Sequence, residues 1–222
     1  MSAAATGRPV VAIIDGGMSY HDDSINREPL RQYFDEVIYL RDLPLHDLSR
    51  FDILIIPCRT NTYWLTPMSD QLQDFMRGGG TLVAMGETFP DRWLPDIGFR
   101  AMETNFWWWL EDGADLGVKI SDPDHPMARH VTREAATFHL HGVFTPLHPN
   151  QKMLIETKEG ECLLFEDTAS YAPGRLIATT LDPFFHHGWF FMPATTDFLV
   201  GFLPWLIEST ATAPAEDRRT AA

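Results

Sequence analysis

The stretch from Arg77 to Thr88, with the sequence RGGGTLVAMGET, constrains the fold of this chain most strongly. Three glycines end the helical pattern that precedes them, an apolar segment follows over 81–85, and another glycine marks a tight turn. A glycine-ended helix that leads directly into a continuous apolar strand is typical of a parallel sheet buried on both faces. The stretch therefore predicts one βαβ unit of an open α/β sheet.

The segments before this stretch repeat the same alternation of strand and helix. Thr66 and Pro67 offer an N-cap and a proline at the first helical position, which favours a helix start at this point. The expected strands span 10–14, 37–40, 52–57 and 81–85, and the expected helices span about 26–34 and 67–77. This order predicts a parallel sheet with right-handed crossovers.

The second half of the chain has a weaker pattern. Several prolines between 89 and 137 interrupt any long element, so we expect an irregular insertion there. Further strands, some of them antiparallel, are expected over 137–141, 153–156, 162–165 and 175–181. Pro193 opens a final amphipathic helix, in which Pro204 predicts a kink or an early end. We expect one domain over 9–210, with disordered tails at 1–8 and 211–222.

Composition excludes several classes of partner. The chain has 222 residues, and its 31 acidic and 17 basic residues give a net charge of −14, which repels nucleic acid and anionic membrane surfaces. No apolar run of about 18 residues is present, and the first residues lack the apolar core of a signal peptide. Cys58 and Cys162 are too few for a disulfide framework. We therefore expect a cytoplasmic protein without nucleic-acid or membrane partners.

Three segments carry a resemblance to a known superfamily. The order of 10–15, 52–57 and 78–87 is similar to class I glutamine amidotransferase-like proteins. Within that superfamily, SDPDHP at 121–126 and GRLIATTL at 174–181 resemble the ThuA-like, trehalose-utilisation group, and the resemblance covers most of 9–207. It implies a flavodoxin-like α/β fold, with a mostly parallel sheet and helices on both faces, and a role in carbohydrate-linked metabolism.

The chain departs from this superfamily at both positions that glutamine hydrolysis requires. Gly86, followed by Glu87, stands where the family delivers a nucleophilic cysteine at a sharp turn. The late segment that would bring the activating histidine reads Leu-Asp-Pro-Phe at 181–184. A thiol without a neighbouring base is a poor nucleophile, so we expect that the protein is not a glutaminase.

Ligands of open α/β sheets bind at the carboxyl ends of the strands, which here are followed by polar residues. The expected catalytic residues are Glu87, Asp15, His186 and Asp182, and the expected ligand-binding residues are Gly16, Gly17, His21, Cys58, Arg59, Asn61, His139, His141, His187 and Trp189. Glu87 is the leading candidate for general acid or base. The alternative for Glu87 is interaction with the N-terminus of a helix, and the alternative for Asp15 is capping of the next loop.

Histidines supply a second hypothesis. His139 and His141 alternate along an expected strand, which would place both on one face, about 7 Å apart. Together with His186 and His187 they could hold a divalent metal, although no H-E-x-x-H motif is present. We expect no cofactor, and keep a divalent metal as the alternative. The same histidines could instead contact a sugar, act as a base, or fill a hydrogen-bonded core.

Two further features have competing interpretations. Cys58, next to Arg59, is either a nucleophile or a small buried apolar residue. The aromatic run over 106–109 suits sugar stacking, core packing or a homo-oligomer interface, and Trp189 would offer a second stacking platform.

These features favour one function and leave two alternatives. The leading hypothesis is a protein that binds a small polar, carbohydrate-derived ligand and acts as a hydrolase or isomerase. The alternatives are a catalytically silent assembly or ligand-sensing module and a metal-dependent hydrolase.

Overall fold

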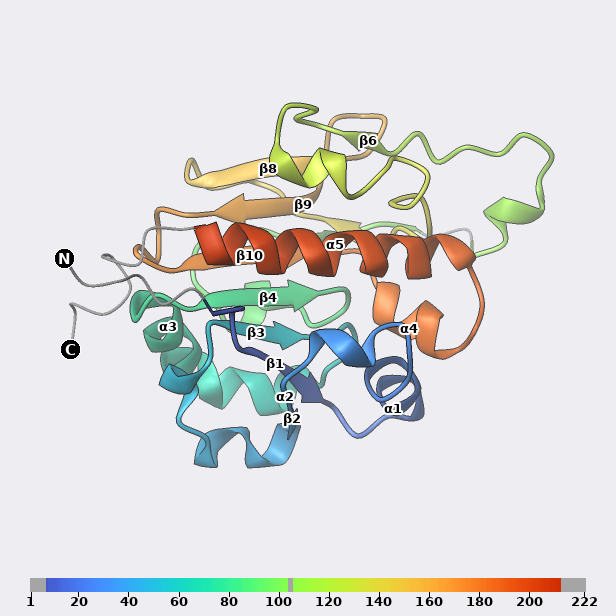
Figure 1. Ribbon diagram of the computed structural model, residues 1–222. Coiled ribbons are helices and arrows are strands. Elements are labelled where there is room, and N and C mark those ends of the chain that lie inside the picture. The colour runs from blue at the N-terminus through green and yellow to red at the C-terminus, as the bar shows by residue number, and fades with distance from the viewer. Residues whose placement is uncertain (1–6, 104–105, 213–222) are drawn as a thin grey trace.

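The computed structural model describes residues 7–103 and 106–212, and within these residues one large sheet forms the centre of the molecule (Figure 1). The sheet runs in the order β2 (Glu36–Tyr39), β1 (Val11–Asp15), β3 (Ile53–Ile56), β4 (Thr81–Met85), β10 (Arg175–Thr179), β9 (Cys162–Asp167), β8 (Gln151–Glu156) and β6 (Lys119–Ile120). The first five strands are parallel and the last three antiparallel. The five parallel strands have the 2-1-3-4-5 order of a flavodoxin-like fold, as predicted.

The central strands are buried on both faces, which explains their continuous apolar sequences. In β4 all five residues are buried. Val83 and Met85 belong to one hydrophobic core, while Leu82 and Ala84 belong to the other. Alternate side chains of a strand point to opposite faces, so one apolar run supplies both cores.

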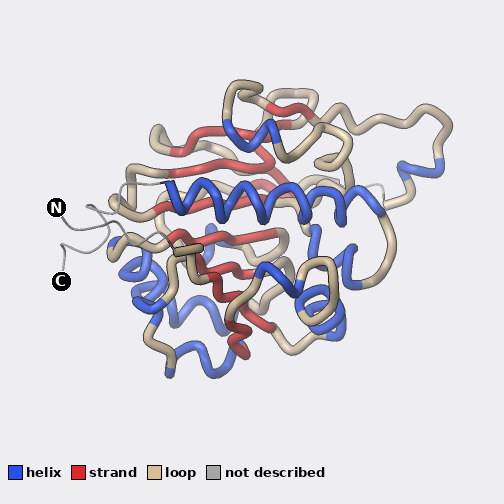
Figure 2. The backbone as a smooth tube through the Cα atoms, in the orientation of Figure 1, coloured by secondary structure: helices blue, strands red, loops and turns tan. Residues whose placement is uncertain are grey.

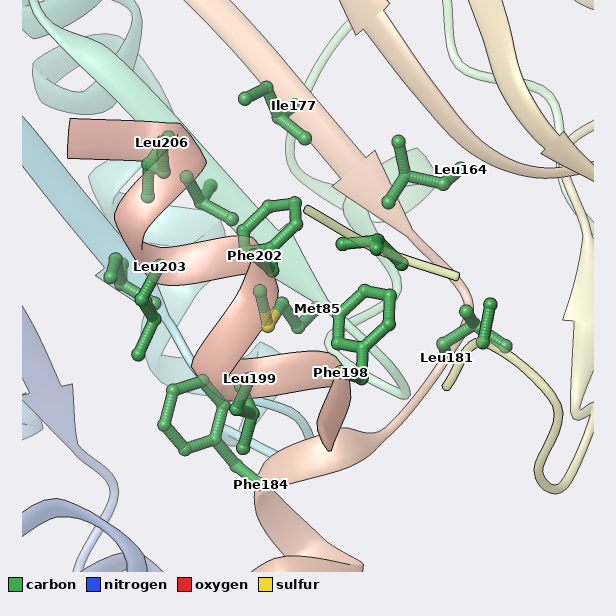
Figure 3. Packing of buried hydrophobic residues seen from close by; sticks show 14 of the residues in the cluster. Met85, Leu164, Ile177, Leu181, Phe184, Phe198, Leu199, Phe202, Leu203 and Leu206 are labelled. Atoms are coloured by element: carbon green, nitrogen blue, oxygen red, sulfur yellow. The ribbon is translucent and has the colours of Figure 1, made fainter. Parts of the chain in front are cut away.

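Helices cover both faces of the sheet. The first core includes residues of α1 (Ser19–Ile25), α4 (Pro183–Gly188) and α5 (Pro193–Thr212). Figure 3 shows Phe198 and Phe202 of α5 beside Met85, and Phe184 of α4 beside Leu199 of α5. The second core includes residues of α2 (Thr62–Leu65) and α3 (Ser69–Arg77). None of the helices in the described part of the chain is long and apolar enough to cross a membrane.

Short elements complete the architecture. A second sheet pairs β5 (Arg100–Ala101) with β7 (Gly142–Val143). The 3-10 helices are η1 (Arg31–Tyr33), η2 (Leu40–Leu45), η3 (Leu48–Arg50), η4 (Thr66–Met68), η5 (Pro90–Arg92), η6 (Trp108–Leu110) and η7 (Pro126–Arg129). Figure 2 shows loops and short helices gathered where the parallel strands end.

Two predicted elements are wrong. The helix expected over 26–34 is replaced by α1, which ends at Ile25, and by the single turn η1. Pro29 explains the difference, because it lacks a backbone N–H and restricts the residue before it. The strand expected over 137–141 is not part of a sheet ladder, and pairing begins only at β7.

The ends of the chain also differ from the expectation in detail. Pro204 lies inside α5 and does not end it, since the helix continues to Thr212. Arg8 is not part of a loose tail, because its guanidinium donates hydrogen bonds to Asp35 and to the carbonyl of Tyr33. The predicted disorder of 1–6 and 213–222 lies outside the described residues.

Candidate functional site

Three neighbouring parallel strands place charged side chains at one edge of the sheet. Ile56 of β3 pairs with Ala84 of β4, and Thr179 of β10 pairs with Met85 of β4. Arg59, Glu87 and Asp182 follow these three strands by only a few residues.

The three side chains meet at this edge. The Nε atom of Arg59 lies 3.1 Å from Glu87 Oε2, and its Nη2 atom lies 3.5 Å from Asp182 Oδ2. The guanidinium therefore contacts one half-exposed carboxylate and one fully buried carboxylate at the same time.

Arg59 is fixed in an uncommon conformation. Its φ of 63° lies in the left-handed region, which non-glycine residues adopt at a cost of about 1–2 kcal/mol. Its guanidinium carbon lies 3.6 Å from the centre of the Phe185 ring, in a cation–π arrangement. Backbone strain of this kind persists where the surroundings hold the residue, and it concentrates at functional sites.

His141 adds an imidazole between the two carboxylates. Its Nε2 lies 3.1 Å from Asp182 Oδ2, and its Nδ1 lies 3.9 Å from Glu87 Oε1. Burial by itself would lower the pKa of His141, but Asp182 and Glu87 outweigh burial and raise it. Burial would likewise raise the pKa of Asp182, but His141 and His186 lower it to about 2. Asp182 is therefore an anion near neutral pH, although its side chain is fully buried.

The two other histidines of the predicted group lie behind His141. The Nε2 atom of His186 lies 3.1 Å from Asp182 Oδ1. The ring centres of His139 and His186 are 4.7 Å apart, and those of His139 and His141 are 6.4 Å apart. The three imidazoles thus converge, even though the strand predicted to carry His139 and His141 does not form.

Gly86 leaves no room for a nucleophile at the sharp turn. Its φ is 58°, and an added Cβ atom would overlap Cys58 Cβ and lie 2.9 Å from Asp182 Cβ. Cys58 offers no substitute, because burial, with Asp182 nearby, raises the pKa of its thiol well above the usual range. Its sulfur accepts a hydrogen bond from the backbone N–H of Phe185. Cysteine-based glutamine hydrolysis has no suitably placed thiol here.

A pocket of about 300 Å³ opens beside these charges. Its walls are formed by Gly86, Glu87, Phe89, Phe99, Ala101, Met102, Phe106, His141 and Thr180. A small number of polar groups among aromatic walls is the usual character of a site for a small molecule. Of the predicted residues, Glu87 and His141 line this pocket. Arg59 forms an ion pair with Glu87, and Asp182 lies beside His141 Nε2.

The loop after β1 has internal partners. His21 is buried, its Nδ1 accepts a hydrogen bond from the N–H of Gly16, and its Nε2 donates one to the carbonyl of Cys58. Asp15 accepts a hydrogen bond from the N–H of Gly17. The two bonds of His21 connect the loops after β1 and β3. The bond of Asp15 stays within its own loop, as the capping alternative for Asp15 expects. Asn61 similarly caps α2 by accepting from the N–H of Tyr63.

Two predicted residues lie apart from the pocket. His187 Nδ1 is 2.7 Å from the hydroxyl of Thr196, and this residue borders a separate hollow beside α5. Trp189 is 58% exposed and packs against Phe185, with ring centres 5.4 Å apart. The structure does not bring Trp189 to the pocket wall.

Sequence reasoning missed most of the aromatic wall of the pocket. Phe89 and Phe99 belong to the irregular segment and pack edge-to-face, with ring centres 5.7 Å apart. Phe106 lies over the histidines, with its ring centre 5.2 Å from that of His139. The signal for Phe106 was present in the aromatic run over 106–109, but nothing in the sequence distinguished the residue that faces the site.

Comparison with known proteins identifies a solved structure of the same fold. A candidate GMP synthase subunit from Thermoplasma acidophilum is similar with a TM-score of 0.56 and 10% identity, over 91% of this chain and 96% of that chain. The Gan42B GH42 beta-galactosidase has a TM-score of 0.42 and 16% identity over 78% of this chain, which spans 27% of that enzyme. An exo-beta-1,4-mannosidase from Opitutaceae bacterium strain TAV5 has a TM-score of 0.45 and 13% identity, over 93% of this chain and 36% of that chain.

The first of these likenesses agrees with the fold that the sequence resemblance predicted. No protein-family model matches the chain, and no curated protein matches it. Membership of the ThuA-like group therefore stays a prediction.

Proposed function

We propose that the protein binds a small polar ligand in the pocket beside Glu87 and catalyses its hydrolysis or isomerisation by acid–base chemistry. The observation that carries this proposal is the meeting of Glu87, Arg59, His141 and Asp182 at the wall of a pocket of about 300 Å³. The pKa of His141, which lines this pocket, is raised, and a perturbed ionisable group in a concave site is a usual sign of catalysis or binding.

Each side chain has a distinct role in this proposal. Glu87 lines the pocket and is the group that exchanges a proton with the ligand. Arg59 contacts Glu87 through Nε and fixes the direction in which the carboxylate points. His141 also lines the pocket, and its raised pKa suits an imidazole that donates to an oxygen of the ligand. Asp182 stabilises the positive charge of His141 and is a positioning residue.

The pocket wall supports a carbohydrate-derived ligand. Phe89, Phe99 and Phe106 offer aromatic faces, and Glu87 and His141 offer polar contacts on the same wall. A sugar or sugar acid has both apolar C–H faces and hydroxyl groups, so it matches such a mixed lining. The resemblance to the ThuA-like group points to the same class of ligand.

The test is a screen for turnover by NMR with a panel of sugars, keto-sugars and sugar lactones. The wild type is expected to convert at least one compound, and Glu87→Gln, which keeps the size of the side chain, is expected to abolish the conversion. Glu159→Gln is the matched control, because Glu159 is exposed on the turn after β8 and contacts only Lys158 among the charged groups of the described residues. Equal turnover by wild type and Glu87→Gln would end the proposed role of Glu87.

A second function, an assembly or ligand-sensing module without catalysis, is favoured by one observation. Trp107, Trp109 and Leu110 are 66%, 48% and 62% exposed on a protruding segment. Large apolar side chains exposed together are typical of an interface. Sedimentation of the wild type and of Trp107→Ala distinguishes the two functions, since only an assembly module requires an oligomer that this substitution weakens.

A further inference from the structure

Several buried polar atoms beside the pocket have no partner in hydrogen-bond geometry among the described residues. They are His139 Nδ1, His141 Nε2, Asp182 Oδ1 and both ring nitrogens of His186. Asp182 and His186 are 0% and 1% exposed, so bulk solvent does not satisfy these atoms. His141 Nε2 and His186 Nε2 each face an oxygen of Asp182 at 3.1 Å, whereas His139 Nδ1 and His186 Nδ1 have no such contact among the described residues. Buried polar groups are almost always paired in native proteins, so these two ring nitrogens, beside a buried carboxylate, indicate a binding place for an ion or a ligand.

The tautomer of His139 follows from its one hydrogen bond. Its Nε2 lies 3.0 Å from the carbonyl oxygen of Phe106, which can only accept, so Nε2 carries the proton. The Nδ1 atom of a neutral ring is then an unprotonated lone-pair donor. A ring whose second nitrogen donates to a backbone carbonyl is the usual arrangement of a metal-binding histidine.

The three histidines lie close enough to share one ion. One nitrogen from each of His139, His141 and His186 lies within 4.8 Å of the other two. The two carboxylate oxygens of Asp182 are each 3.1 Å from an Nε2 atom, one of His141 and the other of His186. Ligands held about 2.1 Å from a tetrahedral zinc ion lie roughly 3.4 Å apart, so small side-chain rotations would bring the three nitrogens onto one ion.

We propose that His139, His141 and His186 bind one divalent transition-metal ion of the zinc class, with Asp182 as the adjoining carboxylate. Imidazole nitrogens favour zinc, cobalt and related ions over calcium and magnesium, which take oxygen ligands. The anionic carboxylate beside the three rings also balances part of the charge of a divalent cation in a buried place.

The catalytic role of the ion rests on the proposed function, but the binding of the ion does not. With the ion bound, the positive charge beside Asp182 belongs to the metal instead of a protonated His141. His141 borders the pocket, and Glu87 Oε1 lies 3.9 Å from His141 Nδ1. Three protein ligands leave a fourth position that a water molecule can occupy, and a metal lowers the pKa of such water to about 7. Glu87 would then be the base that accepts the proton of this water, and the hydroxide would add to the carbonyl carbon of a small polar ester, lactone or amide. As the carbonyl C–O or C–N bond breaks, Glu87 would return the proton to the leaving oxygen or nitrogen.

The test is a titration of the chelator-treated full chain with Co²⁺, followed by the visible absorption of the bound ion. The wild type is expected to bind one Co²⁺ per chain with the intense spectrum of low coordination number, and excess Zn²⁺ is expected to displace it. His139→Ala and His186→Ala are each expected to weaken binding by more than about tenfold. His187→Ala is the matched control, because His187 is the next residue on α4 and pairs with Thr196 instead.

Each outcome supports or overturns the metal site. A wild-type protein that remains folded by circular dichroism and shows no Co²⁺ spectrum overturns it, and so does equal binding by the wild type and His186→Ala. If His186→Ala fails to fold, the wild-type titration and His139→Ala still decide. Glu87→Gln is expected to keep Co²⁺ binding while losing turnover, so failure of the proposed function and failure of the metal site give different results.

Discussion

Replacement of Gly86 by alanine tests why this chain cannot carry a nucleophile at its sharp turn. The new Cβ atom would overlap Cys58 Cβ, lie 2.9 Å from Asp182 Cβ and adopt a φ of 58°. The left-handed backbone costs about 1–2 kcal/mol and overpacking adds about 1–3 kcal/mol, so we expect a loss of roughly 2–5 kcal/mol in the free energy of unfolding. In a domain of this size each kcal/mol lowers Tm by about 2–4 °C.

Urea unfolding measures this loss, and Gly160→Ala provides the matched control. Gly160 has a φ of 82°, but an added Cβ atom would meet only a side-chain oxygen at 4.0 Å. It therefore carries the backbone cost alone, and the difference between the two variants isolates the steric cost at position 86. Equal losses in both variants would refute the steric argument. Measurable glutamine hydrolysis by Gly86→Cys would refute it more directly.

Three further predictions follow from the site. Asp182→Asn is expected to lower the pKa of His141, because Asp182 helps to raise it, and an unchanged imidazole titration by NMR would contradict this pairing. Burial lowers the pKa of His21. The contribution of the neutral ring to the free energy of unfolding should therefore be complete above pH ~6.5 and should decrease as the pH drops from there, because the unfolded chain gains a proton that the folded ring excludes. Urea unfolding across that range should show a weaker pH dependence in His21→Asn. Arg59→Gly should change stability by less than about 2 kcal/mol, because relief of its left-handed backbone offsets the loss of its ion pairs with part-exposed Glu87 and buried Asp182, yet it should weaken ligand binding strongly. Calorimetry with the ligand found by turnover checks this last result, and retained affinity would argue against the role of Arg59.

The sequence predicted the first half of the fold well, because its signals are local. The continuous apolar runs at β1, β3 and β4 and the glycines after Arg77 each indicate one element without knowledge of the rest. The second half depends on contacts between distant residues. Whether 137–141 pairs into a sheet depends on its neighbours rather than on its alternating pattern, so the strand predicted there was wrong.

In the candidate site, too, the residues with local sequence signals were predicted and those that depend on distant contacts were not. Glu87 and Asp182 were found because each follows a strand that the sequence identifies. The convergence of His139 with His186 was expected for the wrong reason, since these residues meet through the packing of α4 against an irregular segment. Phe89 and Phe99 were missed as pocket residues, because no local pattern shows which side chains of an irregular segment point inward.

The most direct test of the proposed site is a comparison of ligand-induced thermal stabilisation in the wild type and in Glu87→Gln and Arg59→Gly. The panel holds sugars, keto-sugars, sugar lactones and divalent ions. A compound that raises the Tm of the wild type, and raises that of Arg59→Gly much less, is the predicted result, because Arg59 and Glu87 form one contact at the pocket wall. A compound that stabilises all three proteins equally would place its binding elsewhere and contradict the account.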